Sequence, residues 1–123
     1  MPQYMISVWH DETYSVDFST PDAQRRVALV GKFNEELQRV GAWVFAAGLH
    51  PSSSATVVRS LDGRVSMTDG PYAETKEALL GFYLIDCASL DEAIETAKAI
   101  GRDEKVVFEI RPVKLFLPNG IAK

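Results

Sequence analysis

The sequence predicts an α+β fold, a ferredoxin-like sandwich that carries an inserted β-hairpin. Three observations support this prediction. Two segments repeat apolar residues at helical spacing, each lies between strand-like segments, and a hairpin turn signal separates the two halves. Two βαβ halves of this kind form the ferredoxin-like arrangement. The 123 residues are expected to form one domain, 1–123, of which 114–123 is a C-terminal tail with an apolar patch at 115–117.

The first half of the chain has the order strand, helix, strand. Apolar and β-prone residues predict a strand over 4–9. The run STPD at 19–22 supplies a hydroxyl cap and a proline for the first helical turn. Gly41 ends this helix, because glycine accepts a left-handed conformation. Alternation over 43–49 predicts the second strand. The apolar stripe of the helix is Val27, Val30, Phe33, Leu37 and Val40.

A hairpin is predicted between the two halves. The strand-like segments 56–59 and 64–68 flank Asp62-Gly63, a strong signal for a two-residue turn. The next strand, 80–87, has two apolar faces. Phe82 and Leu84 point one way, and the alternate residues Tyr83, Ile85 and Cys87 point the other way. Such a strand should be covered on both sides.

The second half ends with a helix and a last strand. Ser89 and Glu92 have the spacing of a reciprocal capping box. Gly101 ends the helix, and alternation over 106–111 predicts the last strand. The apolar stripe of this helix is Leu90, Ala93, Ile94, Ala97 and Ile100. Pro71 is expected to open a helical turn through 73–76.

Two helices can cover only one face of the predicted sheet. The other face would then expose apolar residues in a single copy, and exposed patches of that size mark interfaces. We therefore expect a homodimer that packs sheet against sheet.

Composition and charge exclude several classes of protein. The 13 Lys and Arg residues and 17 Asp and Glu residues give a net charge of −4, which disfavours nucleic-acid binding. No apolar stretch approaches the roughly 20 residues that span a bilayer, and the N-terminal residues lack the features of a signal peptide. Cys87 stands alone in an apolar run, which favours a buried, reduced thiol over a reactive nucleophile. We expect a cytoplasmic protein with no membrane partner.

The central run DGPYAETKEALLGFYLID, residues 69–86, resembles the signature of the YCII-related domain family in its DGPF subgroup, with Tyr72 in place of the usual Phe. Supporting stretches are 48–59, 62–71, 90–100 and 108–113. The resemblance implies a dimeric α+β barrel. It also implies small bacterial proteins that are often encoded near alternative sigma factors and have no established general activity.

The wider family includes members proposed to use a His–Asp pair and one enzyme class that removes chloride from hydroxylated aromatics. The histidine of that pair lies in the first helix of the family. The predicted helix 21–40 contains no histidine here, so the pair is not carried over. Only Asp69, in the DGP turn, matches an acidic position of the family pattern.

Two residues are candidates for proton transfer. Asp69 either accepts hydrogen bonds from the N–H groups of its own turn or faces a cleft, where partial shielding would make it a general base. His50 lies in a Gly-Leu-His-Pro run that fixes its direction. It is either a surface or packing histidine or a second proton carrier.

Four residues are candidates for substrate binding. Arg59 and Arg111 lie on predicted strands, where each is either part of a structural ion pair or an anchor for an anionic or enolic substrate. A pair between Arg111 and Glu109 is expected only across adjacent strands. Tyr72 and Tyr83 offer hydroxyl groups and stacking surfaces to the same pocket.

No metal site and no cofactor are predicted. His10, Asp11 and Glu12 are adjacent in the chain and favour a solvated loop, and no spacing typical of a zinc or iron site is present. Dinucleotide, P-loop and nucleophile-elbow motifs are also missing from the sequence.

The sequence leaves two functions open. The first is a small dimer that binds a small organic molecule in a cleft near the dimer interface, with cofactor-free proton-transfer or lyase-type chemistry. The second is a non-catalytic interaction module, associated with alternative sigma factor systems, whose cleft and tail bind a partner segment.

Overall fold

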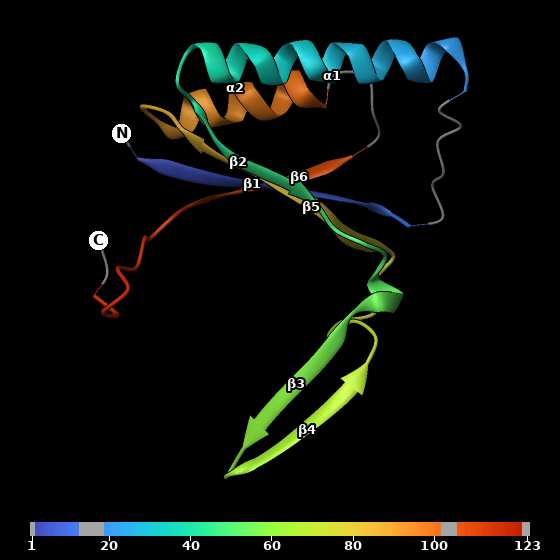
Figure 1. Ribbon diagram of the computed structural model, residues 1–123, viewed down its shortest axis with the longest axis vertical. Helices are drawn as coiled ribbons and strands as arrows, with labels where there is room; N and C mark the ends of the chain where they lie inside the picture. The colour runs from blue at the N-terminus through green and yellow to red at the C-terminus, as the bar shows by residue number, and fades with distance from the viewer. Residues whose placement is uncertain (1, 13–18, 102–105, 122–123) are drawn as a thin grey trace.

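A four-stranded antiparallel sheet with two helices on one face forms the body of the protein (Figure 1). The computed structural model describes residues 2–12, 19–101 and 106–121. The sheet has the strand order β2-β5-β1-β6, which is compatible with a ferredoxin-like fold and confirms the mixed α+β prediction. The elements are β1 (Gln3–Asp11), α1 (Pro21–Arg39), β2 (Trp43–Gly48), the 3₁₀ turn η1 (Ser52–Ser54), β3 (Thr56–Leu61), β4 (Arg64–Asp69), β5 (Glu77–Asp86), α2 (Leu90–Ile100) and β6 (Val107–Pro112).

Helix α1 begins and ends where its local sequence requires. The Thr20 hydroxyl accepts a hydrogen bond from the N–H of Ala23 at 3.2 Å, as a hydroxyl cap does. After the helix, Gly41 adopts a φ of 77°. Of the predicted apolar stripe, Leu37 is buried, whereas Val27 and Val40 are exposed. Neither of the two described helices combines the length and apolar character needed to cross a bilayer.

The cap of helix α2 differs from the predicted box in one detail. The Ser89 hydroxyl accepts a hydrogen bond from the N–H of Glu92 at 3.3 Å, as predicted. The Glu92 carboxylate accepts its bond from the N–H of Ala88 at 2.9 Å, one residue before the expected donor. The reciprocal box is therefore shifted by one residue on the carboxylate side.

The core lies between the helices and the covered face of the sheet. Ile6 of β1 and Ile85 of β5 are fully buried and pack with Ala93 and Ala97 of α2. Cys87 is also buried there as a free thiol, and burial raises its pKa. The structure thus agrees with a buried thiol and not with an activated nucleophile.

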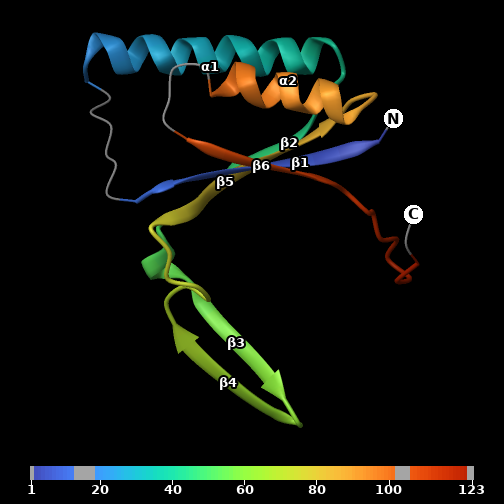
Figure 2. The ribbon, with the colours of Figure 1, turned by 180° about the vertical axis from the view of Figure 1, so that it is seen from behind.

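The opposite face of the sheet, called the open face below, has no helix over it (Figures 1 and 2). The pairing register places Phe82 beside Ala47, and Leu84 beside both Phe45 and Met5, on this face. The whole chain exposes 9251 Å², whereas a folded monomer of 13.6 kDa exposes about 6,600 Å². The single copy thus exposes roughly 2,650 Å² more than its size requires.

Strands β3 and β4 form a separate two-stranded antiparallel sheet, called the ribbon below. Asp62 and Gly63 connect the strands with φ values of 49° and 78°, the positive pair that a type I′ turn needs. In both ribbon views the β3–β4 ribbon extends away from the main sheet on the side opposite the helices (Figures 1 and 2).

The segment between the ribbon and β5 corrects one prediction. Residues 71–76 form no helical turn, and β5 already begins at Glu77. Glu77 pairs with Asp11, and Ala78 pairs with His10, so β1 draws three more residues into the strand than the apolar pattern indicated. Long-range pairing with β1 sets the early start of β5, and Pro71 opens no helical turn in the connection before it.

Candidate functional site

The six predicted site residues fall in three regions of the fold. Tyr83 lies on the helix-covered side of the sheet, and Arg111 lies on the edge strand β6. The ribbon and its base hold the other four, which are Asp69, His50, Arg59 and Tyr72.

Asp69 is the last residue of β4, at the base of the ribbon. Its strand partner is Thr56, and the following N–H, from Gly70, donates to the carbonyl of Ala55 at 2.8 Å. Gly70 has a φ of 103°, a conformation that favours glycine. Within the described residues no N–H group of this turn donates to the Asp69 carboxylate, which is exposed. Backbone hydrogen bonding therefore holds the turn, and the carboxylate is accessible to solvent in a single copy.

Arg59 and Asp69 lie on opposite faces of the ribbon. Asp69 shares a face with its partner Thr56, and Arg59 is three residues further along β3. The Arg59 guanidinium lies over the ring of Tyr72, with its carbon 5.7 Å from the ring centroid. One copy therefore brings Arg59 and Tyr72 together but does not bring Arg59 to Asp69. The two-residue turn at Asp62-Gly63 fixes this register, so the separation was already encoded in the sequence.

His50 lies in the connection between β2 and the ribbon. The residue before it, Leu49, donates its N–H to the carbonyl of Leu80 at 2.8 Å, and the carbonyl of Pro51 accepts the N–H of Ser54 at 2.9 Å. The backbone is thus held on both sides of His50. Its imidazole is exposed and has no hydrogen-bond partner within the described residues.

Glu12 is a site residue that sequence reasoning assigned to a solvated loop. Its carboxylate accepts the hydroxyl of Ser52 at 2.6 Å and the N–H of Ser52 at 2.7 Å. These bonds connect the end of β1 to η1, two residues after His50. They lower the pKa of Glu12, the Ser52 hydroxyl more than the Ser52 N–H. No local pattern could indicate this contact, because 40 residues separate the partners.

This contact should depend on pH. A carboxyl whose pKa is lowered by folding contributes stability above its usual value of 4.5, and this contribution is lost as the pH falls through the lowered pKa. We expect the amide proton shift of Ser52, followed by NMR, to change with a midpoint below 4.5. In Glu12→Gln that titration should disappear, while the Ser54 amide should be unaffected in both proteins. A Ser52 shift with the same pH dependence in the wild type and in Glu12→Gln would contradict the contact.

Tyr83 projects from β5 toward α1. Its hydroxyl donates to the Asn34 side-chain oxygen at 3.2 Å. Its ring meets that of Trp43 edge to face, with centroids 5.9 Å apart and an interplanar angle of 87°. The ring is thereby fixed in one orientation.

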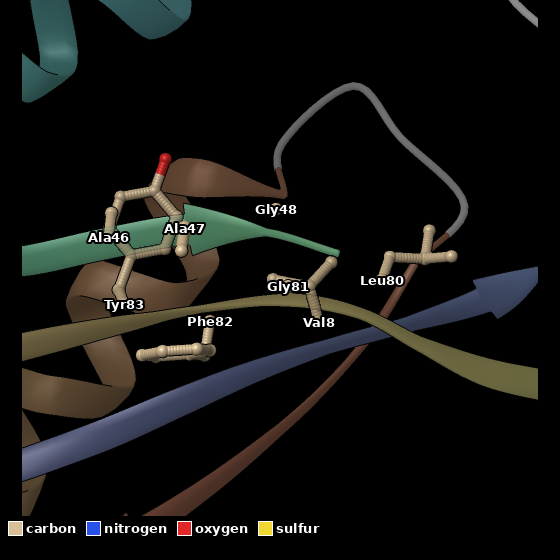
Figure 3. A pocket seen from close by; sticks show the side chains of 8 residues that line it. All are labelled: Val8, Ala46, Ala47, Gly48, Leu80, Gly81, Phe82 and Tyr83. Carbon is tan, nitrogen blue, oxygen red and sulfur yellow. The ribbon is translucent and has the colours of Figure 1, made fainter. Parts of the chain in front are cut away.

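Tyr83 also lines a shallow hollow of about 330 Å³ on the sheet (Figure 3). Small residues of β2 and β5 leave this space open, and Figure 3 shows Tyr83 and Phe82 projecting from opposite sides of β5. Its volume is at the lower end of the range for small-molecule sites. The lining residues are Val8, Ala46, Ala47, Gly48, Leu80, Gly81, Phe82 and Tyr83.

Arg111 forms a structural ion pair, one of its two predicted roles, but the geometry of the pair was not expected. Its Nε lies 2.8 Å from the Glu109 carboxylate, two residues away on the same strand. The sequence prediction that this pair forms only across adjacent strands is wrong, because both long side chains bend toward each other along the open face. Glu109 pairs with Ser7 and Arg111 with Met5, so this ion pair lies on the side of the sheet opposite the ring of Tyr83.

Comparisons with known proteins identify the family of this chain. The model of the YCII-related domain matches residues 3–117. The chain belongs to the YCII-related domain family. The chain is also similar to an uncharacterized protein of Rhizobium meliloti (strain 1021), R00369, which is 35% identical over 120 residues. The match covers 96% of this chain and 97% of the relative.

Membership of the YCII-related family does not by itself define the chemistry of the site. That chemistry depends on the side chains present. Among residues 2–12, 19–101 and 106–121, no group of three His, Cys, Asp or Glu side chains could hold a metal ion. The polar groups near the hollow and at the base of the ribbon are a phenol, an imidazole and carboxylates. These groups bind through hydrogen bonds and exchange protons.

Proposed function

We propose that this YCII-related protein binds a small organic molecule, and that the hollow beside Tyr83 is the binding site. The observation that carries the proposal is the hollow itself, which is about 330 Å³ and lined mainly by apolar side chains. Ligand sites combine such apolar walls with a few fixed polar groups. The Tyr83 hydroxyl, held by Asn34, is a polar group of this kind. The size and the aromatic wall favour a ligand with a single ring system.

The proposal includes a homodimer in which two open faces meet, as in a dimeric α+β barrel. The uncovered apolar residues of the open face and the excess of exposed surface support this arrangement. The run Asp69-Gly70-Pro71-Tyr72 supports a place in the DGPF subgroup. The lone, buried Cys87 supports a reducing, cytoplasmic location.

The chemistry that these side chains offer is proton transfer, and the proposal assigns the protein no cofactor. At the base of the ribbon, outside the lining of the hollow, Asp69 would act as the base and His50 as a second proton carrier, in proton-transfer or lyase-type steps. A second function is favoured by the tail, where Phe116 is exposed between Leu115 and Leu117. Such a tail suits a non-catalytic module that binds a protein segment, such as one from an alternative sigma factor system.

Two aromatic probes test the binding site, the neutral indole and the anionic 4-hydroxybenzoate. We expect at least one of them to shift the backbone amide signals of Gly48, Gly81 and Tyr83 in a saturable titration. The substitution Ala46→Leu fills the hollow and should weaken this binding at least about tenfold without unfolding the protein. As a matched control, Ala99→Leu adds the same side chain to the exposed face of α2 and should leave binding unchanged. Absence of shifts with both probes, or equal binding by both variants, would contradict the proposed site.

A further inference from the structure

We propose that the β3–β4 ribbon is an intermolecular arm, whose apolar face packs on a second copy of the chain and encloses Asp69 at its base. This inference rests on the homodimer proposed above. It adds that the surroundings of Asp69 are incomplete in one copy and are completed by the partner.

The two faces of the ribbon differ in character. The register places Val58, Val65 and Met67 on one face, called the apolar arm face, and all three are largely exposed, at 61%, 67% and 74%. The opposite face carries Arg59 and Arg64 together with the apolar residues Val57 and Leu61. The apolar arm face thus has three large apolar side chains and no cation, whereas two guanidinium groups favour contact with water on the other face, so the apolar arm face is the one better suited to packing.

The ribbon needs a packing partner to keep its shape. An isolated two-stranded hairpin is only marginally stable in water, and three strands or a packed face are needed for lasting stability. The ribbon extends away from the main sheet (Figures 1 and 2), so the sheet does not cover the apolar arm face. Another surface must supply that cover.

The direction and length of the ribbon identify a second copy as that surface. Six residues per strand rise about 20 Å, whereas two packed sheets lie only about 10 Å apart. The ribbon leaves the main sheet on the open-face side (Figure 1), so a copy docked on the open face would lie beside it. The arm is long enough to pass the partner's sheet.

The exposed surface area of the single copy is consistent in size with the area that a homodimer interface would bury. Obligate homodimers bury about 2,000–5,000 Å² in total, or roughly 1,000–2,500 Å² for each copy. The excess of roughly 2,650 Å² on the single copy is slightly above the upper end of that range. The open face and the apolar arm face are the exposed apolar surfaces that such an interface would use.

Asp69 lies on the same face of the ribbon as Met67, two residues away along β4. A second copy that covers the apolar arm face would therefore also exclude water from the Asp69 carboxylate. Residues of the partner would then form part of the pocket around Asp69.

A charge on the apolar arm face tests the proposal. We expect Met67→Glu to weaken self-association at least about 100-fold in sedimentation equilibrium, because a symmetric dimer contains the substitution twice. Ser66→Glu places the same charge on the opposite face of the same strand and should change association less than about threefold. Equal effects of the two substitutions, or a wild-type chain that is monomeric at micromolar concentration, would overturn the arm.

Isotope-filtered NOE spectra give a second measurement that needs no variant. In a mixture of labelled and unlabelled wild-type chains, the methyl groups of Met67 and Val58 should show contacts to the other copy. A dimer without such contacts would contradict the proposal that the ribbon is an intermolecular arm. It would not contradict the homodimer formed by two open faces. The titration with aromatic probes tests binding in the hollow independently of dimerisation. A result that contradicts the intermolecular arm can therefore be distinguished from one that contradicts the proposed binding site.

Discussion

The substitution Gly81→Ala should destabilise the protein by about 3 kcal/mol and lower its melting temperature by roughly 10 °C. A Cβ at this position would lie 2.5 Å from the carbonyl oxygen of Ala47 and 3.1 Å from the Cα of Gly48. Both neighbours are backbone atoms of β2, so no side chain can rotate away. Strand β2 would have to separate from β5, which opens a ladder of backbone hydrogen bonds and deforms the hollow that both strands line.

Gly48→Ala provides the matched control for Gly81→Ala. Gly48 is the strand partner of Gly81, but its Cβ would meet only the carbonyl oxygen of Leu80 at 3.9 Å, an ordinary contact. We expect a change below about 1 kcal/mol, because the backbone there has room for a methyl group. Urea unfolding of both variants measures the difference. Equal stabilities would show that β2 and β5 do not approach each other as closely as the structure indicates.

The parts of the fold that the sequence predicted are those decided by neighbouring residues. The hydroxyl of Thr20, the left-handed Gly41 and the turn at Asp62-Gly63 act within a few residues of themselves, so a local pattern identifies them. The early start of β5 at Glu77 could not be identified in this way. It depends on pairing with Asp11, and the sequence does not state where the end of β1 will lie.

The candidate site shows the same division between local and distant information. Tyr83 was predicted to offer a ring and a hydroxyl, and it lines the hollow, but its partner Asn34 comes from a helix 49 residues earlier. The bond between Glu12 and Ser52 depends on two chain segments that meet only after folding. The separation of Asp69 from Arg59 was available locally, since a two-residue turn sets which residues of a ribbon share a face.

The substitution Phe45→Glu should separate the proposed homodimer while leaving each chain folded. Phe45 lies on the open face beside Phe82, with ring centroids 5.9 Å apart, and is 53% exposed in a single copy. A carboxylate there stays in water in the monomer, so it should cost the monomer little. In a symmetric dimer of open faces two such charges would be buried in one interface, so we expect association to weaken at least about 100-fold.

Leu90→Glu is the matched control, because Leu90 is 48% exposed on α2, on the helix-covered side of the protein. Light scattering over a dilution series should give a monomer for Phe45→Glu and a dimer for both wild type and Leu90→Glu, while circular dichroism shows the same helix and strand content in all three. The two positions match in exposure and in charge change, whereas Phe45 lies on the open face and Leu90 lies on a helix at the covered side of the sheet. If Phe45→Glu associates as tightly as Leu90→Glu, the open face is not the interface, and another surface must account for the excess exposed area.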